Sequence, residues 1–418
     1  MNGTSSLWPS LLPANAVLGP GQTAVRAHGH RVEYADGSTR LCATSGLWNV
    51  PLGYGNPAVA EAVARTLFDA SYLSLFRTSH SYAEDAADAL VGLAGRTAYQ
   101  RLVFSTSGGA ANDAAMKLVR QYWAQRGEPA RSVIVGLKGG YHGTMYGSHA
   151  LSGDELLQRM YSVDRRAIRH VAHDDVAELE RLLEREGDRV GAVVVEPVLG
   201  SGALALSEGF VNGILEMRER HGFLLVADEV ATGFGRTGPL FASGEWASAP
   251  DVLLLSKALT NGAMGAAAIL IGSRVAREFI DARWTFVHGE TQAGTPACAA
   301  AILAVIEELD RMDVLSTTRD LSVRLRRLAD GLVADGIVVD ITGRGCFLGL
   351  ALAHPDGIGL TSHEVQEVVS AIADHGAIVQ PGPSAIELIP AYGYDDDDLA
   401  ELDAAVRCGI GWFRAGER

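Results

Sequence analysis

The sequence predicts an α/β protein with a mostly parallel sheet flanked by helices, joined to a smaller α+β domain. Short apolar runs alternate with helical patterns between about residues 101 and 271. Such runs are typical of parallel strands that are buried on both faces. After Thr295-Pro296 the pattern changes to long helices and short strands. We therefore expect an N-terminal segment of residues 1–50 that joins the small domain, a large domain of residues 51–295, and a C-terminal α+β domain of residues 296–418.

The first elements expected are a hairpin and a helix. Residues 25–41 form the hairpin, because Asp36-Gly37 is a favoured turn sequence. Pro51 to Gly55 follows as a loop, before a helical pattern at residues 58–68. The expected strands of the sheet are residues 102–105, 132–137, 192–196, 223–227, 252–255 and 267–271, with helices at residues 112–126 and 208–221.

The C-terminal elements begin at Pro296, which suits the first turn of a helix because proline lacks the amide hydrogen. Helices are expected from there to about Arg311 and on to Ala334. They are followed by strands at 338–342 and 345–352, a helix at 362–375, two short strands, and a helix at 395–413. The acidic run Asp395 to Asp398 fits a helix N-terminus, where the dipole favours negative charge.

Composition excludes several classes of protein. Hydrophobic residues make up 48% and charged residues 20%, which supports a large core and argues against disorder. The net charge of -15 disfavours a nucleic-acid partner. The 4 cysteines include no C-x-x-C pair, which favours reduced thiols over disulfides or zinc. Met1 to Pro13 does not resemble a signal peptide, and Ala263–Gly272 is too short to cross a membrane. We expect a cytoplasmic protein with no membrane partner.

Four groups of residues follow predicted strands, and ligands of open α/β sheets bind where strands end. The first group is Ser105–Asn112, between a strand and a helix. The small residues Ser107, Gly108 and Gly109 let the backbone approach an anion, and the helix N-terminus offers free N–H groups. An ordinary strand-to-helix turn is an equally good interpretation of this segment alone.

The second group is Gly139-Gly140-Tyr141-His142-Gly143, where an aromatic residue is framed by glycines. A tyrosine in this position can stack on a flat ring. Taken alone, the segment is better explained as a tight turn with a packed tyrosine.

The third group is the Asp228-Glu229 pair, directly after a buried apolar run. Burying Asp228 is unfavourable unless the carboxylate meets a cation, and a protonated pyridine nitrogen would be one. The alternative is a pair of carboxylates that cap a helix at a solvated strand end. We favour the buried carboxylate, because its burial needs an explanation.

The fourth group is Leu254–Leu259, which contains Lys257. A desolvated lysine has a lowered pKa and attacks an aldehyde to form a Schiff base. Taken alone, the segment is slightly better explained by a lysine that reaches water from a strand end. Together, an anion cradle, a stacking ring, a nitrogen-pairing carboxylate and an amine are the parts that pyridoxal 5'-phosphate (PLP) requires.

These residues resemble the class III (omega-type) aminotransferases, which are fold type I PLP enzymes, over nearly the whole chain. The matching segments are Leu47-Trp48-Asn49-Val50, residues 106–113, Tyr141-His142-Gly143, Glu196-Pro197, Asp228-Glu229-Val230, residues 232–238, Ser256–Leu259 and His288–Thr291.

The resemblance implies a role for each matching residue. Lys257 is implied to be the Schiff-base lysine and proton carrier, and Asp228 the partner of the pyridinium nitrogen. Trp48 and Glu196 are implied to border the substrate pocket. The implied cofactor contacts are Ser107, Gly108, Gly109, Tyr141, His142, Glu196, Val230 and Thr291, the last from the partner subunit of a homodimer with shared active sites.

The sequence departs from the family pattern at the substrate end. Gly109 and Ala110 stand where the family has a hydroxyl residue and a glutamate. Thr144 and Gln380 stand where various members carry arginines that bind substrate carboxylates. A site without such an arginine discriminates poorly for a carboxylate.

We therefore expect a small-molecule amine donor and a carbonyl acceptor without an adjacent carboxylate. A simple ketone would fit, as would the C-terminal ketone of a ribosomal peptide, on which daptide-type relatives act. An omega-amino acid or diamine aminotransferase is an alternative, as is another PLP enzyme, an aminomutase or a decarboxylase. A non-catalytic PLP-binding scaffold is a further hypothesis, against which the intact Lys257 and Asp228 argue.

Overall fold

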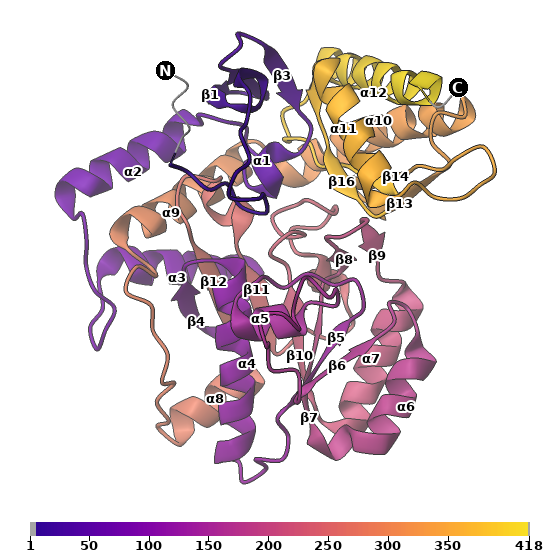
Figure 1. Ribbon diagram of the computed structural model, residues 1–418. Coiled ribbons are helices and arrows are strands. Elements are labelled where there is room, and N and C mark those ends of the chain that lie inside the picture. Colours follow the sequence, from indigo (N-terminus) through magenta and orange to yellow (C-terminus); the bar gives the residue numbers. More distant parts are fainter. Residues whose placement is uncertain (1–5, 417–418) are drawn as a thin grey trace.

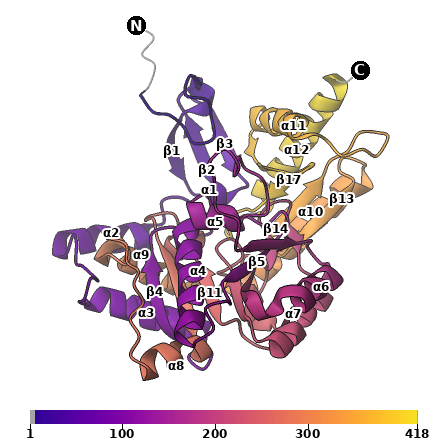
Figure 2. The ribbon, with the colours of Figure 1, turned by 60° about the horizontal axis from the view of Figure 1, so that its bottom comes forward.

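The computed structural model describes residues 6–416 and has two parts (Figure 1). A large sheet with its helices forms the lower part of the view, and the N-terminal strands lie beside the C-terminal helices in the upper part. Figure 2 shows the same division from a second direction. The ends of the expected terminal segments, residues 1–5 and 417–418, lie outside the described residues.

The central sheet has 7 strands in the order β4-β12-β11-β10-β7-β5-β6. Strand β12 is antiparallel to β11 and to β4, whereas the other neighbouring strands are parallel. The mostly parallel sheet expected from the sequence is thus confirmed. Its strands are β4 (Tyr99–Ser105), β5 (Val133–Leu137), β6 (Ile168–Val171), β7 (Val190–Val195), β10 (Leu224–Asp228), β11 (Val252–Leu255) and β12 (Ala267–Gly272).

Helices cover both faces of this sheet. In β11, Val252 and Leu254 pack into one core cluster, and Leu253 and Leu255 into another. This alternation explains why the strands are apolar without a break. One face is covered by α4 (Gly108–Gln125), α5 (Tyr146–Leu151) and α8 (Ser273–Asp281). The other is covered by α2 (Pro57–Asp69), α3 (Ser81–Ala94), α6 (Val176–Glu186), α7 (Glu208–His221) and α9 (Pro296–Arg311).

The N-terminal segment forms three strands rather than the single hairpin expected. These are β1 (Ala24–His28), β2 (Arg31–Tyr34) and β3 (Thr39–Cys42). Asp36-Gly37 lies in the turn between β2 and β3, as predicted. A second reversal at Gly29, whose φ is +55°, adds β1 to this sheet. Strand β15 (Ala377–Ile378) pairs with β3 and so links the two ends of the chain.

The C-terminal part has a sheet and a core of its own. The sheet order is β13-β14-β17-β16. Its core is shared with three helices, whereas α9 packs into the core of the central sheet. We therefore propose that the C-terminal domain begins between α9 and α10, rather than at residue 296. The elements are α10 (Val314–Ala334), β13 (Asp340–Arg344), β14 (Phe347–Ala351), α11 (Ser362–Asp374), β16 (Gln380–Gly382), β17 (Ala385–Leu388) and α12 (Asp396–Gly416).

The predicted chemical groups gather at one edge of the central sheet. Strands β4, β5, β10 and β11 run in the same direction, so their carboxyl ends share that edge. A short hairpin, β8 (Val198–Leu199) and β9 (Leu204–Ala205), follows β7. Within residues 6–416, no helix has the length and apolar character needed to span a membrane.

Candidate active site

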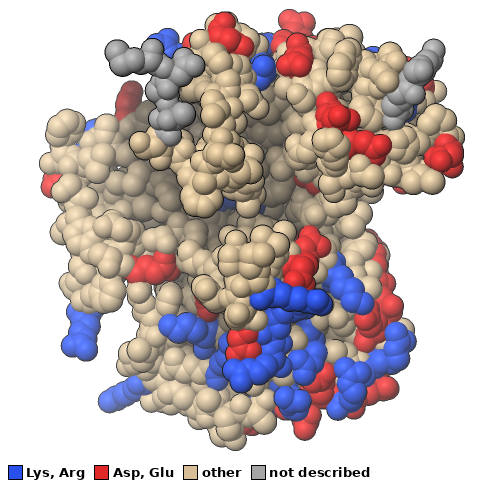
Figure 3. Space-filling model, in the orientation of Figure 1, with Lys and Arg blue, Asp and Glu red and all other residues tan. Residues whose placement is uncertain are grey.

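A cavity of about 330 Å³ lies where these strands end. Figure 3 shows this face of the molecule hollowed between its upper and lower parts, with mostly uncharged residues around the hollow. The cavity brings together most of the predicted site residues, namely Ser107, Gly108, Gly109, Tyr141, His142, Thr144, Glu196, Asp228, Val230 and Lys257. Trp48, Thr291 and Gln380 are not among its lining residues.

Lys257 lies just beyond the end of β11 in a strained conformation. Its φ of +47° is in the left-handed region, which is unfavourable for a residue with a side chain. The Lys257 Nζ atom lies 4.3 Å from the centre of the Trp48 ring. Burial lowers the pKa of Lys257 to about 8, although nearby carboxylates act in the opposite direction. A large fraction of the amine is therefore neutral near this pH, which is the form that attacks an aldehyde.

Trp48 is carried by a left-handed turn, α1 (Ser45–Trp48). Ser45, Leu47 and Trp48 have φ values of 46°, 60° and 66°. Each non-glycine residue in this conformation costs about 1–2 kcal/mol. The Ser45 hydroxyl donates a 2.6 Å hydrogen bond to the carbonyl of Ile389, and the buried Arg236 donates one of 3.4 Å to Ser45. These contacts with distant segments hold the turn in place.

Asp228 is a buried carboxylate at the end of β10. Its Oδ2 atom accepts hydrogen bonds from Asn112 Nδ2 at 2.7 Å and from His142 Nδ1 at 2.8 Å. Its Oδ1 atom accepts one from the amide of Val230 at 3.1 Å. Burial acts to raise the pKa of Asp228, but these hydrogen bonds outweigh it and the net shift is downward. The carboxylate therefore remains charged in the cavity wall, where it can pair with a cation.

Glu196 follows β7 and holds two loops by their backbones. Its carboxylate accepts hydrogen bonds from the amide of Tyr141 at 2.7 Å and from the amide of Gly200 at 3.0 Å. The contact with Tyr141 fixes the main chain beneath the predicted stacking ring. Burial raises the pKa of Glu196 to about 7.

The predicted anion cradle lies at the first turn of α4. Ser107 caps this helix, because its hydroxyl accepts a hydrogen bond from the amide of Ala110 at 3.2 Å. The helix begins at Gly108, earlier than the expected Asn112, so Gly108 and Gly109 belong to its first turn. A Cβ on Gly108 would lie 2.9 Å from Val230, and one on Gly143 would lie 2.6 Å from the Gly109 Cα. Glycine is therefore required for this close approach of backbone segments, which leaves helix N–H groups for an anion.

The comparison with known families identifies the kind of enzyme to which this site belongs. Residues 17–407 match the family described as aminotransferase class-III. The chain belongs to the class III aminotransferases. Enzymes of this class use PLP, and the aminotransferase described here does so too.

Individual relatives support the same assignment. This aminotransferase is 32% identical to an acetylornithine aminotransferase of Xanthomonas axonopodis pv. citri, over 96% of the chain and 94% of that relative. It is 27% identical to an omega-amino acid–pyruvate aminotransferase of Pseudomonas putida, over 87% of the chain and 86% of that relative. The names of these relatives differ in substrate, so the similarity alone does not select one.

A solved structure shows the fold type. An amine transaminase from an uncultivated Pseudomonas species, in a PLP-bound form, matches with a TM-score of 0.92 and 25% identity. The match covers 99% of this chain and 100% of that one. The fold type I architecture expected from the sequence is thus confirmed.

The residues of this aminotransferase fit PLP on three independent observations. The backbone cradle of Gly108 and Gly109 suits a phosphate, and the ionised Asp228 suits a protonated pyridine nitrogen. The amine of Lys257, with its lowered pKa, suits the aldehyde. PLP carries these three groups on one molecule, and all three protein groups line one cavity.

The other predicted residues lie at or beyond the rim of the cavity. Thr144 lines the cavity and is exposed, whereas Gln380 is half-buried in β16, opposite Glu387 of β17. Thr291 is exposed, and its neighbour Glu290 accepts a 3.0 Å hydrogen bond from the amide of Thr106, just before the cradle. The roles of these residues stay predictions.

Two contributions to the site were not predicted from the sequence. Asn112, which belongs to the predicted cradle segment, lies one helical turn after Gly108 and donates a hydrogen bond to Asp228. Glu387 is a charged residue within the apolar strand β17, and it is close enough to Lys257 and Glu196 to act on them electrostatically. Like Asp228, Glu387 is a carboxylate in an otherwise apolar strand, so the same sequence pattern could have predicted it.

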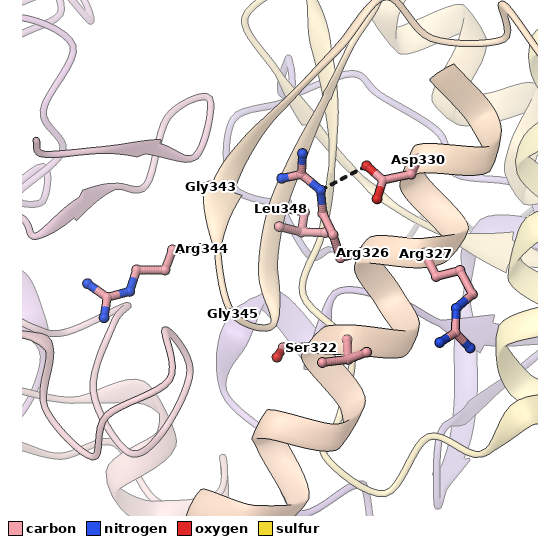
Figure 4. Close-up of a pocket in the computed structure, with 9 residues that line it drawn as sticks. Ser322, Arg326, Arg327, Asp330, Gly343, Arg344, Gly345 and Leu348 are labelled. Carbon is pink, nitrogen blue, oxygen red and sulfur yellow. Dashed lines mark hydrogen bonds and ion pairs between the residues drawn. The ribbon is translucent and has the colours of Figure 1, made fainter. Parts of the chain in front are cut away.

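A second hollow of about 540 Å³ is lined by arginines but does not form an anion site. It lies between α10 and the hairpin of β13 and β14 (Figure 4). Figure 4 shows that the side chains of Arg326, Arg327 and Arg344 point in different directions. Arg326 pairs with Asp330 at 2.9 Å, and Arg344 pairs with Glu245. The hollow shares no lining residue with the PLP cavity.

A serine at position 109 of the cradle should strengthen the binding of PLP. A Cβ on Gly109 would meet its nearest atoms at 3.5 Å, an ordinary contact distance, so we expect Gly109→Ser to fold normally. Its hydroxyl adds one donor for the phosphate, which is worth about 0.5–1.5 kcal/mol, or about a two- to tenfold tighter PLP complex. Titration of the cofactor-free enzyme with PLP measures this change. Gly143→Ser is the control and should weaken binding, because its Cβ would lie 2.6 Å from the Gly109 Cα. Weaker binding by Gly109→Ser would contradict the assignment of the cradle.

Proposed function

We propose that this aminotransferase transfers an amino group to a ketone or aldehyde that lacks a carboxylate beside the reacting carbon. The observation that carries this proposal is the absence of arginine from the described residues that line the cavity. A bidentate arginine is the usual partner of a substrate carboxylate, and Thr144 offers only a hydroxyl. A simple ketone meets this requirement, as does the modified C-terminal ketone of a ribosomal peptide. A diamine is a second candidate, because Glu387 adds a carboxyl to the site.

We assign the chemical steps to residues of the cavity. PLP, when bound, withdraws electrons from the carbon that bears the amino group, which makes its proton acidic. Lys257 would hold the cofactor and carry that proton, and its lowered pKa supports both tasks. Asp228, oriented by Asn112 and His142, would pair with the pyridine nitrogen. Tyr141 and Val230 would hold the ring between them, and Glu196 fixes Tyr141 by its backbone.

We further propose a homodimer with shared active sites, in which Thr291 contacts the phosphate bound by the partner subunit. The exposure of Thr291 in the single chain supports this proposal, as does its absence from the chain's own cavity lining. The hydrogen bond between Glu290 and Thr106 keeps the segment close to the cradle. A cytoplasmic location stays a prediction from the sequence.

A screen of amine donors tests the proposed substrate class. Each donor is mixed with the PLP enzyme, and conversion of the aldehyde form to the amine form is followed by absorbance. We expect simple amines to convert the cofactor stoichiometrically, and ketones without a carboxylate to restore it. With an α-amino acid in place of a simple amine, a decarboxylase would instead release carbon dioxide and return the aldehyde. Rapid restoration by a wide range of α-keto acids, with none by simple ketones, would overturn the proposal.

The uptake of PLP should depend on pH through Lys257. Because burial lowers the pKa of Lys257 to about 8, its neutral form is populated above that pH and is lost as the pH falls below it. We expect the rate of covalent PLP uptake by the cofactor-free enzyme to rise with pH and to level off above about pH 8. Stopped-flow absorbance at a series of pH values measures this profile. A midpoint near 10, which is typical of an exposed lysine, would show that the amine is not desolvated.

A further inference from the structure

Glu387 is a buried carboxyl group with an oxygen that no protein group satisfies. It is 1% exposed, on the apolar strand β17. Its Oε1 atom accepts a 2.6 Å hydrogen bond from the amide of Gly202. Its Oε2 atom has no hydrogen-bond partner among residues 6–416. Leaving such a group unsatisfied costs about 1–3 kcal/mol, so we expect a hydrogen-bond donor of a ligand to occupy the position next to this oxygen.

Glu387 lies beside the PLP cavity, although it is not among the residues that line it. The turn between β8 and β9 binds two carboxyls, because Gly200 donates to Glu196 at 3.0 Å and Gly202 donates to Glu387 at 2.6 Å. A Cβ on Gly382 would lie 2.8 Å from Glu387 Oε1, so a larger residue there would displace the carboxyl from this position. The side chain lies close enough to Lys257 for the two to affect each other's pKa.

The charges around Glu387 select the kind of ligand. Glu196 and Glu387 lie close together, and burial raises the pKa of Glu387 to about 8. Once Lys257 is joined to PLP, its ammonium no longer balances these carboxyls. An ammonium at this position would favour the ionised form of Glu387 and satisfy its free oxygen, and an amide N–H would satisfy the same oxygen. A substrate carboxylate would find no cationic partner there.

We infer that Glu387 binds a second nitrogen of the substrate, near the carbon that is aminated, through its free Oε2 atom. This nitrogen is either the ammonium of a diamine or the N–H of an amide. The inference rests on the proposed function. In place of an arginine that binds a substrate carboxylate, the site has a carboxyl group that binds a substrate nitrogen.

A matched set of donors tests the inference. The set is sec-butylamine, its analogue with a terminal amino group, the N-acetylated form of that diamine, and alanine. For the unmodified enzyme we expect the diamine, the acetylated diamine, or both to exceed sec-butylamine in kcat/KM by about tenfold or more. The better of the two identifies an ammonium or an amide as the ligand. Equal rates for all three amines would overturn the inference while leaving the proposed function intact.

Substitution of Glu387 separates recognition from a structural role. In Glu387→Gln the ratio of kcat/KM between the better nitrogen-bearing donor and sec-butylamine should shrink to within about threefold, whatever the change in the absolute rates. Glu387→Asp retains the charge and should restore part of the preference. Glu245→Gln removes a surface carboxylate and serves as control. An equal loss with every amine would mean that Glu387 only supports the fold, and would overturn the inference. If the unmodified enzyme reacted with none of the three amines, the proposed function would be refuted instead.

A readout without cofactor completes the test. The infrared spectrum of cofactor-free enzyme, taken against that of Glu387→Gln, isolates the carboxyl band of Glu387. Addition of the diamine or the acetylated diamine should shift this band, whereas sec-butylamine should not. An unchanged band with both nitrogen ligands would overturn the inference. This result does not depend on the activity of any variant.

Discussion

Replacement of Lys257 by alanine should abolish transamination and remove the covalent link to PLP, while the protein remains folded. The loss of proton transfer alone is worth about 10²–10⁴-fold in kcat. The fold should tolerate the change, because the Lys257 side chain lines a cavity and its amine lies over the Trp48 ring without a hydrogen-bond partner among residues 6–416. Alanine does not remove the strain of the positive φ, so stability should change little.

Lysine content makes this prediction easy to check. Only Lys117, Lys138 and Lys257 occur in the whole sequence. Reduction of the PLP enzyme with borohydride, followed by peptide mass spectrometry, should place the cofactor on Lys257 alone. Lys138→Ala removes a surface lysine that pairs with Glu178 at 2.8 Å, and it should keep full activity. Cofactor attached to Lys117 or Lys138, or activity retained in Lys257→Ala, would refute the assignment.

The cofactor end of the site could be predicted because its residues lie next to strand ends. Asp228 ends β10, and Lys257 comes just after β11, so the parallel pairing of these strands brings the two side chains to one edge. Local sequence carries that information. The direction of β12 was not predictable in the same way, because a strand buried on both faces is equally apolar in either direction.

The substrate end depends on contacts between distant segments, which local sequence does not encode. Trp48 reaches Lys257 because the strained turn before it is held by Arg236 and Ile389. Glu387 lies near Lys257 and Glu196 on a strand of the C-terminal sheet. The early start of α4 was missed for a different reason, since glycine is a poor helix former and the cap at Ser107 compensates for it.

Asp228 offers the second large effect, because its charge is expected to pair with the pyridine nitrogen. In Asp228→Asn the side-chain oxygen still accepts from the Val230 amide, but the new NH2 group faces the donors Asn112 Nδ2 and His142 Nδ1, so the free energy of unfolding should fall. The charge is lost as well, and the ring of bound PLP would then withdraw electrons less strongly. We expect kcat to fall by about 10²–10³-fold, the usual effect of removing one preorganised electrostatic contact. Single-turnover absorbance with a good amine donor measures this loss.

Asp251 provides a matched control in the same strand pair. It is also buried, and its carboxylate accepts hydrogen bonds from Arg218 and from the Leu225 amide, each at 2.8 Å, near the start of β10 rather than at its end. Asp251→Asn breaks a buried ion pair and should lower the free energy of unfolding by about 3–5 kcal/mol, with activity per folded molecule unchanged. Asp228→Asn should show a different pattern, a large loss of rate per folded molecule in addition to its loss of stability. If both variants lost only stability, Asp228 would be a structural carboxylate, and the electron sink of the site would have to be maintained by another residue.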